Sequence, residues 1–171
     1  FPNLGRGNAV RTAMLAAKGD WRLVLDGDLA SPLGEIQKLI PYFENNMCDI
    51  IIGSRRIQGA HIEKPPSTIR WILGMGFIMM TQIITNIKVS DVSCGFKCFS
   101  KKSAEIIFPK TKINRWSHDA ENLYLAKKFN LRICELPLYW NNAKETRVHI
   151  ISAIIYSFFG LLKIVYLHHN K

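Results

Sequence analysis

The sequence predicts an α/β protein with a mostly parallel sheet and helices on both of its faces. Helical and strand patterns alternate along the first third of the chain, which is typical of parallel strands joined by crossover helices. One strand segment is continuously apolar, as expected where both faces of a sheet are buried. The chain has 171 residues, of which 48% are hydrophobic and 21% charged, so it can form a domain with a substantial core.

Alternating helices and strands are expected in the first half of the chain. Residues 8–18 are rich in alanine and end before Gly19, which indicates a helix followed by a stop signal. A short apolar strand follows at residues 23–25, and residues 32–45 place their apolar side chains at near-helical spacing. Residues 49–53 are the continuously apolar strand.

The second half continues the pattern with longer helices. Residues 69–84 are apolar over a length that predicts a helix, and residues 89–99 predict a loop that leads into a strand. Residues 101–107 and 117–129 predict two further helices, while partial alternation at residues 131–140 predicts a strand. No internal repeat or low-complexity tract interrupts this order.

Net charge indicates the class of partner, and the cysteine pattern indicates the redox compartment. The net charge is +10, which favours an anionic membrane surface or a phosphorylated substrate. The basic residues form no long block and no aromatic and basic strand platform, so a nucleic-acid partner is not expected. The four cysteines form no C-x-x-C pair, and we expect free thiols in a reducing compartment rather than zinc ligands or a disulfide framework.

Two carboxylates follow the first predicted strand. Asp26 and Asp28 are two positions apart, so in an extended chain they project to the same side. Ligands bind at such strand ends in open α/β sheets. Carboxylate oxygens suit a hard divalent cation, which in turn can hold a diphosphate. A lone Asp-x-Asp also occurs in many surface turns, so its meaning depends on the neighbouring motifs.

The segment at residues 148–167 is strongly apolar and approaches the length of a membrane span. A thin polar stripe crosses it at Ser152, Tyr156, Gly160 and Lys163. We expect a helix that lies in the membrane interface and turns Lys163 and the terminal His168-His169-Asn170-Lys171 toward lipid headgroups. The alternatives are an ordinary core helix, or packing against a membrane segment outside this sequence.

Several motifs match one family in order: Asn3-Leu4-Gly5-Arg6-Gly7, Asp26-Gly27-Asp28-Leu29-Ala30-Ser31-Pro32, Gly53-Ser54-Arg55, Asp91 to Phe99, Arg115 to Glu121, and Glu135 to Trp140. The chain resembles the dolichyl-phosphate mannose synthases and dolichyl-phosphate glucosyltransferases of glycosyltransferase family 2, and is more similar to the glucosyltransferase branch. The resemblance implies a GT-A fold in residues 1–147, followed by the interface helix at residues 148–171. The family's first strands would precede Phe1 and are missing from this sequence.

The resemblance also implies a reaction. It indicates an inverting glycosyltransferase that moves glucose or mannose from UDP-glucose or GDP-mannose to a polyprenyl phosphate at a membrane surface. The expected location is the cytoplasmic face of the endoplasmic reticulum in a eukaryote, or the plasma membrane in a prokaryote. A phosphate acceptor is already ionised near neutral pH, so little proton removal is needed. The main task is to bring two anions together with a metal and basic side chains.

The matching positions receive roles from the resemblance. The catalytic carboxylates would be Asp26, Asp28, Asp91 and Asp119, and the residues that bind the nucleotide sugar would be Asn3, Gly5, Arg6, Asp26 and Arg147. Asp28, helped by Asp26, would hold Mg²⁺ or Mn²⁺ on the donor diphosphate, although Asp26 is also a candidate to face the ribose or the sugar. Arg55 and Arg70 would clamp the acceptor phosphate, because a guanidinium fork suits phosphate oxygens. Alternatively, Asp119 caps the helix at residues 117–129 and Glu121 complements its dipole.

Four positions depart from the family pattern, and the smallest change is Gly27 in place of the usual Ala. Ala30 stands where some mannose synthases have a Gln that helps to hold the metal, and His118 stands where Phe is usual. Gly74 replaces a Ser expected on the acceptor side, four residues after Arg70. Two other functions therefore stay open. One is transfer to a hydroxyl acceptor with Asp119 or Asp91 as base, and the other is a protein that binds nucleotide sugar or anionic lipid without catalysis.

Overall fold

The computed structural model describes residues 3–115, 117–141 and 150–169, with the side chains of all of these except Arg70 and residues 150–155. Within this part of the chain, the central sheet has four strands in the order β1-β4-β2-β5. Their bounds are Trp21–Val24 for β1, Lys97–Ser100 for β4, Ile50–Ser54 for β2 and Ile133–Pro137 for β5. A short parallel pair, β3 (His61–Ile62) and β6 (Tyr139–Trp140), lies beside it.

One strand of the sheet is reversed. Strands β1, β2 and β5 run in the same direction, and β4 runs opposite to both of its neighbours, β1 and β2. The prediction of a mostly parallel sheet is confirmed in that three of the four strands run in the same direction. The pairings on both sides of β4 are nevertheless antiparallel. The path of the chain explains this reversal. Asp91 is hydrogen-bonded to Arg55, just beyond the end of β2, so the chain enters β4 from that rim and runs back.

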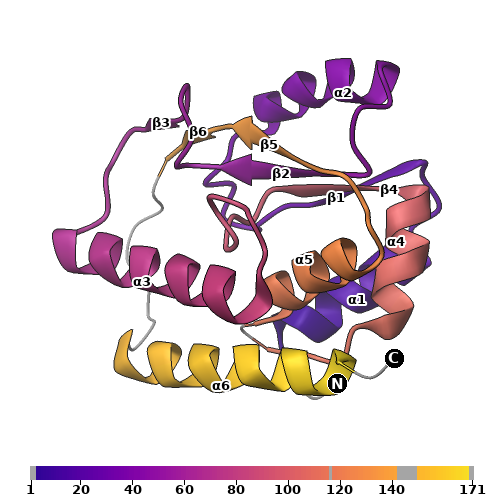
Figure 1. The fold of residues 1–171 in the computed structure, drawn as a ribbon. Helices are drawn as coiled ribbons and strands as arrows, with labels where there is room; N and C mark the ends of the chain where they lie inside the picture. Colours follow the sequence, from indigo (N-terminus) through magenta and orange to yellow (C-terminus); the bar gives the residue numbers. More distant parts are fainter. Residues whose placement is uncertain (1–2, 116, 142–149, 170–171) are drawn as a thin grey trace.

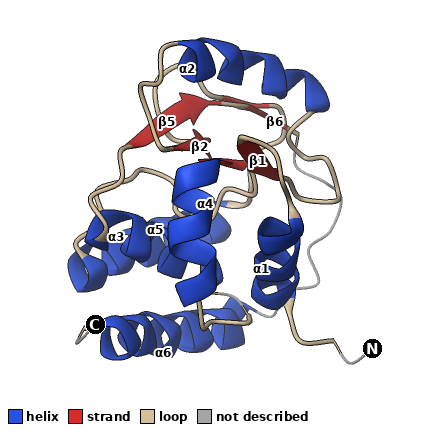
Figure 2. Cartoon of the chain, turned by 90° about the vertical axis from the view of Figure 1, so that its right-hand side faces the viewer, coloured by secondary structure: helices blue, strands red, loops and turns tan. Residues whose placement is uncertain are grey.

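Helices cover both faces of the sheet, as predicted (Figure 1). On one face lie the 3₁₀ segment η1 (Leu33–Leu39) and helix α2 (Ile40–Glu44). On the other face lie α1 (Arg6–Ala16), α3 (Thr68–Thr85), α4 (Lys101–Ile107) with the short η2 (Phe108–Lys110), and α5 (His118–Lys128). Helix α6 (Ile150–His168) lies beyond these, against α3 and α5, and Figure 2 shows the same layers after a quarter turn.

The helix predicted at residues 32–45 forms in two parts, η1 and α2. Pro41 stands in the first turn of α2. Proline has no N–H to donate to a carbonyl four residues earlier, so an α-helix cannot run through this position, although proline suits the start of a helix. The chain therefore ends a 3₁₀ segment at Leu39 and begins a new helix.

Burial on both faces explains the continuously apolar segment at residues 49–53. In β2, Ile50 and Ile52 pack into a large core between the sheet and the helices beneath it, together with Phe99. Ile51 points the other way, into a second core that includes Leu39. Side chains alternate across a strand, so only a strand covered on both faces needs apolar residues at consecutive positions.

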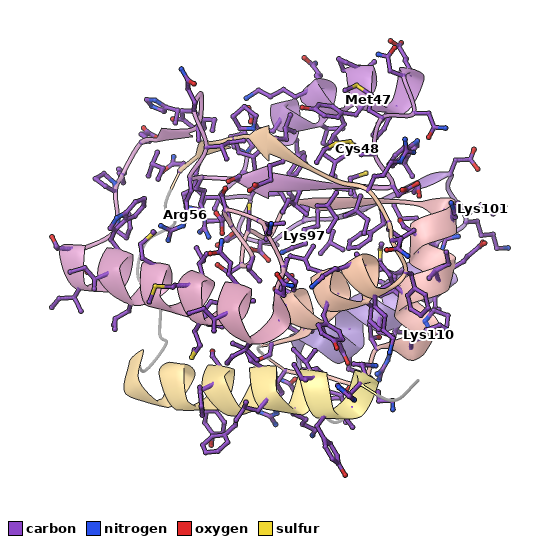
Figure 3. All side chains as sticks on the ribbon, in the orientation of Figure 1. Met47, Cys48, Arg56, Lys97, Lys101 and Lys110 are labelled. Carbon is purple, nitrogen blue, oxygen red and sulfur yellow. A yellow bond between two sulfur atoms is a disulfide. The ribbon has the colours of Figure 1, made fainter. Side chains whose placement is uncertain are left out.

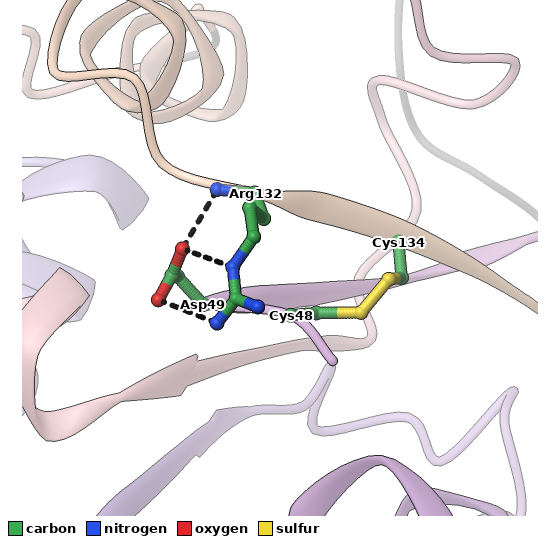
Figure 4. Close-up of a disulfide and its surroundings, with 4 residues drawn as sticks. All are labelled: Cys48, Asp49, Arg132 and Cys134. Atoms are coloured by element: carbon green, nitrogen blue, oxygen red, sulfur yellow. Dashed lines mark hydrogen bonds and ion pairs between the residues drawn. A yellow bond between two sulfur atoms is a disulfide. The ribbon is translucent and has the colours of Figure 1, made fainter. Parts of the chain in front are cut away.

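Two of the four cysteines are paired, which makes the expectation of free thiols wrong for them. Cys48 and Cys134 form a disulfide with 5.9 Å between their Cα atoms (Figure 4). They are 86 residues apart, and only the register of β2 against β5 brings them together. The Asp49 carboxylate accepts hydrogen bonds from the backbone N–H and the side chain of Arg132 beside this disulfide. The cysteines at positions 94 and 98 are free and buried.

Helix α6 is in part a core helix. Leu161 and Ile164 are buried in the larger core, whereas Tyr166 is 83% exposed. The expectation that His168 faces headgroups is wrong, because His168 is buried and its Nε2 lies 2.7 Å from Oε1 of Glu121. No helix in the described part of the chain is long and apolar enough to cross a membrane.

Candidate active site

The predicted site residues gather at the rim where β1 and β2 end and β4 begins. Asp26 follows β1, Arg55 follows β2, and Lys97 is the first residue of β4. Gly95 brings this start of β4 against the first strand, because a Cβ at Gly95 would collide with the Asp26 carboxylate. Glycine at this position therefore allows the rim to close around Asp26.

A chain of charged side chains crosses the rim. The Arg6 guanidinium donates to Oδ1 of Asp26 at 2.5 Å and to Oδ2 of Asp119 at 3.0 Å. The other oxygen of Asp119 accepts from Nζ of Lys97 at 2.7 Å. Arg6 lies in the first turn of α1, directly after Gly5, whose φ of 99° suits glycine. The structure thus brings three predicted site residues, Arg6, Asp26 and Asp119, together in one cluster.

Asp119 is held as a carboxylate. Burial alone would raise the pKa of Asp119, but the nearby positive charges of Lys97 and Arg6 and the hydrogen bond from Lys97 outweigh that effect and lower the pKa below its ordinary value. The alternative in which Asp119 caps α5 is not what the structure shows, because its carboxylate is directed to Lys97 and Arg6. Ser117 is the N-cap residue, and it makes no side-chain capping bond in the described structure.

Glu121 anchors the neighbouring loop rather than acting on the helix dipole alone. Its buried carboxylate accepts from the backbone N–H groups of Lys112 and Ile113, each at 2.9 Å. It also contacts the His168 ring. One carboxylate therefore joins α5, the loop before it and the end of α6.

His118 orients Arg6. The Nδ1 atom lies 3.0 Å from the carbonyl oxygen of Arg115, which can only accept, so Nδ1 carries the proton. The Nε2 atom then accepts from Nη1 of Arg6 at 2.7 Å. Burial lowers the pKa of His118, and the nearby Arg6 and Lys97 act in the same direction against the opposing charge of Asp119. The neutral ring is thus the form that fits this position.

Arg55 is held by a second buried carboxylate. Its Nε donates to Oδ2 of Asp91 at 2.6 Å and its Nη2 donates to Oδ1 at 2.9 Å, while the guanidinium lies 4.6 Å from the centre of the Trp140 ring. Burial would raise the pKa of Asp91, but Arg55 lowers it. Asp91 is 0% exposed, so the structure places this predicted catalytic carboxylate behind Arg55, where it can position the arginine.

The donor set at Asp26 and Asp28 fits a cation that is shared with a diphosphate. Asp28 is exposed, and its Oδ1 accepts the backbone N–H of Ala30 in a turn that holds Leu29 at a φ of 51°. Such a φ is uncommon for leucine and is typical of strained turns at functional sites. The described residues contain no cluster of three or more His, Cys, Asp or Glu side chains that could hold a metal. Mg²⁺ is commonly held by one or two carboxylates together with substrate phosphates.

The remaining predicted residues are placed only in part. The Asn3 side chain accepts the backbone N–H of Gly5 at 3.0 Å, which shapes the entry to α1. Arg70 lies in the first turn of α3, and its side chain is outside the described structure. Arg147 is also outside the described residues.

Sequence reasoning missed two basic residues, Lys97 and Arg56, which Figure 3 labels in the interior and beside α3. Lys97 is 1% exposed and is the partner of Asp119. Arg56 lies with its guanidinium 4.3 Å from the centre of the Trp71 ring, and a Cβ at Gly74 would approach its Nη2 to 2.9 Å. Its buried Nε has no hydrogen-bond partner in the described structure. The sequence held one sign of the position of Arg56. Position 74 is Gly where the family pattern has Ser, and the missing side chain leaves room for the Arg56 guanidinium.

Comparison with known proteins identifies the family of the chain. Residues 1–108 match the profile of the family described as glycosyl transferase family 2. Dolichyl-phosphate beta-glucosyltransferase ALG5C of Trichomonas vaginalis is 32% identical over 158 residues, which cover 89% of this chain and 46% of that protein. The dolichyl-phosphate beta-glucosyltransferase of Dictyostelium discoideum is 32% identical over 90% of this chain and 48% of its own length, and that of Homo sapiens is 29% identical over 85% and 47%.

The fold has a solved counterpart. Glucosyl-3-phosphoglycerate synthase from Mycobacterium tuberculosis, in complex with UDP, superimposes with a TM-score of 0.66 at 14% sequence identity. The match covers 94% of this chain and 55% of that chain. At this identity the likeness shows a common GT-A fold. The chain spans about half the length of the curated relatives it matches.

Proposed function

The chain belongs to glycosyl transferase family 2, and on that basis we propose that it transfers glucose from UDP-glucose to dolichyl phosphate at a membrane surface. The observation that carries this proposal is the meeting of carboxylates and arginines at one rim of the sheet. Arg6 forms an ion pair with Asp26 after β1, and Arg55, which follows β2 at the same rim, forms an ion pair with Asp91. The names of the relatives support glucose as the sugar and dolichyl phosphate as the acceptor.

On the donor side, Asp28 and Asp26 would hold Mg²⁺ or Mn²⁺. When bound, such a cation neutralises the charge that develops on the departing diphosphate. Arg6 adds a fixed positive charge beside Asp26, and His118 holds that guanidinium in place. These side chains bind and orient the donor before the reaction, so little reorganisation is needed when charge develops.

On the acceptor side, Arg55 and Arg56 offer positive charge to a phosphate. Asp91 fixes the plane of Arg55, and the Trp71 ring fixes Arg56. A guanidinium with a fixed orientation loses little entropy when it binds a phosphate. We assign Arg70 to the same clamp from its place in the first turn of α3, close in sequence to Trp71.

The carboxylates also favour a phosphate acceptor over a hydroxyl acceptor. A general base for a hydroxyl works best with a pKa raised toward neutral pH. The pKa values of Asp91 and Asp119 are both lowered, and both groups are buried and paired with a cation. An acceptor that is already ionised needs neither of them as a base.

The outer faces of α3 and α6 support membrane attachment. The two helices pack against each other, and each leaves large apolar side chains exposed: Ile69, Ile72, Met79 and Ile83 on α3, and Tyr156, Phe159, Leu162 and Tyr166 on α6. An apolar surface of this kind suits the boundary between lipid headgroups and acyl chains. We propose peripheral attachment through these helices, on the cytoplasmic face.

The direct test is transfer to lipid. The protein is incubated with dolichyl phosphate and radiolabelled UDP-glucose in Mg²⁺, and the expected product is a labelled glycolipid. Chelation should stop the labelling, and Asp28→Asn should abolish it, while Glu44→Gln, a change at the end of α2, should leave it unchanged. Label from GDP-mannose alone, or label in a hydroxyl acceptor, would contradict the proposal.

A further inference from the structure

A basic and aromatic groove lies between helix α6 and two other segments, one with Asn3 and Leu4 and one with residues 112–115 and Ser117. Its volume is about 820 Å³. Lys112, Arg115 and Lys163 line it together with Tyr156 and Phe159, and no Asp or Glu does so among the described residues. Asn3, a predicted nucleotide-sugar-binding residue, also lines this groove, but none of the charged residues at the β1 and β2 rim does so. The groove therefore lies beside the candidate active site and not within it.

The three cations of the groove are not used elsewhere in the described structure. Their residues are exposed, and no hydrogen bond or ion pair is formed there by the side chains of Lys112, Arg115 and Lys163. Like charges gathered without a counter-charge repel one another, and an anion placed among them removes that cost.

The groove has a fixed frame. The buried Glu121 carboxylate holds the backbone of Lys112 and Ile113, and it also contacts His168 near the end of α6. On the other side, Gly160 packs so closely on Ser117 that a Cβ would collide with the serine side chain. These contacts hold the loop and the helix at a set separation, so the groove is built into the fold.

The sequence pattern of α6 also points to this groove. Tyr156, Gly160 and Lys163 belong to the thin polar stripe of the helix, and all three line the groove. Phe159 and Tyr156 are largely exposed beside it. Aromatic and lysine side chains arranged in this way are typical of the membrane interface, where the ring contacts acyl chains and the cation reaches a headgroup.

We propose that this groove binds the phosphate headgroup of an anionic phospholipid and thereby fixes α6 on the membrane. The three cations supply the charge that a phosphodiester needs, and the aromatic rings supply contact for the glycerol and acyl chains. A soluble phosphate would use the cations alone, which is why the combination favours lipid. The inference does not depend on the identity of the sugar or of the acceptor.

The test measures binding of the protein to vesicles. We expect binding to phosphatidylcholine vesicles that contain phosphatidylserine to be at least about tenfold tighter than to phosphatidylcholine alone, since each basic residue near such a surface contributes appreciably. The variant Lys112→Gln/Arg115→Gln/Lys163→Gln should lose most of this difference. A charge-matched control, Lys18→Gln/Lys64→Gln/Lys101→Gln, removes three exposed cations that do not line the groove and should retain it.

Three further arms make the outcome decisive. Arg115→Lys/Lys163→Arg keeps the charges and should keep the preference for anionic vesicles, which would assign the loss in the triple variant to lost charge; circular dichroism of the triple variant checks that it is folded. Soluble glycerol phosphate should not displace the vesicles, and its success would mean that the groove takes free phosphate rather than lipid. Equal binding by the groove variant and the control variant would overturn the proposal. Transfer activity is measured separately, with a short-chain polyprenyl phosphate in detergent, so failure of either proposal is seen independently.

Discussion

Lys97 and Asp119 form a buried ion pair, with 2.7 Å between Nζ and Oδ1, that joins the start of β4 to the first turn of α5. The second oxygen of Asp119 receives Arg6, which in turn reaches Asp26. The position of Arg6 beside the first strand therefore depends on a lysine on the reversed strand. The pair therefore contributes to the stability of this part of the fold, and it holds the Asp119 carboxylate that positions Arg6.

Removal of Lys97 should destabilise the fold strongly. Lys97→Met leaves the Asp119 carboxylate buried with fewer positive charges, and breaking one side of such a pair costs about 3–5 kcal/mol. The free energy of unfolding, measured with urea, checks this value. The double variant Lys97→Met/Asp119→Leu removes both charges and should recover most of the loss. A single variant as stable as the wild type would show that the pair contributes nothing.

Asp91 should act through Arg55. Asp91→Asn keeps the size of the side chain but removes its charge, so it weakens a charge-assisted contact of about 1.5–3 kcal/mol. We expect the KM for the phosphate acceptor to rise roughly tenfold to a hundredfold, with the KM for the donor unchanged. Ser93→Ala, which removes a weaker partner of Arg55 at 3.2 Å, is the matched control with a smaller effect. A fall in kcat alone would instead identify Asp91 as a base.

Local sequence pattern was sufficient for most of the helices and strands and for part of the site, although the strand predicted at residues 131–140 forms as two strands, β5 and β6, in different sheets. The strand that ends before Asp26 and the apolar segment at residues 49–53 place their last residues at one rim, because parallel strands of one sheet end on the same side. Asp26 was predicted on that ground, and Arg55 was predicted from the family resemblance. Their roles in donor binding and acceptor binding stay predictions.

What was missed depends on contacts between distant segments. Three features were missed: the reversal of β4, the disulfide between Cys48 and Cys134, and the ion pair between Lys97 and Asp119. Each joins residues that are far apart in the sequence, so no helical or strand periodicity indicates that they meet. Lys97 lies within a motif that had been recognised, but a lysine in a strand gives no sign that it will be buried. Its 1% exposure follows from the carboxylate placed opposite by α5.

The disulfide should stabilise the fold without affecting donor binding. It joins the segment before β2 to the first half of β5, at the end of these strands opposite to Arg55. Cys48→Ser/Cys134→Ser frees a loop of 86 residues, and loss of such a cross-link costs about 2–4 kcal/mol in the free energy of unfolding. Urea unfolding with and without reductant measures this. Reductant should lower the stability of the wild type and leave the double variant unchanged.

His118 should make the fold sensitive to mild acid. Burial lowers its pKa below the ordinary value of 6.5, so below that pH the unfolded chain binds a proton more readily than the folded chain. The free energy of unfolding should therefore fall as the pH drops from 6.5 toward the folded pKa, by at most about 1.4 kcal/mol per pH unit. Above pH 6.5 both states are neutral at this ring, and its contribution is constant.

Paired carboxylates such as Asp119 lose their contribution only at lower pH, because the pKa of Asp119 is lowered from 3.8. His118→Phe places the residue that is usual in the family at this position and removes the titrating group, so the slope of the free energy of unfolding just below pH 6.5 should become shallower. Equal slopes for the two proteins in that range would show that His118 takes up its proton without cost and that its bond to Arg6 does not require the neutral ring.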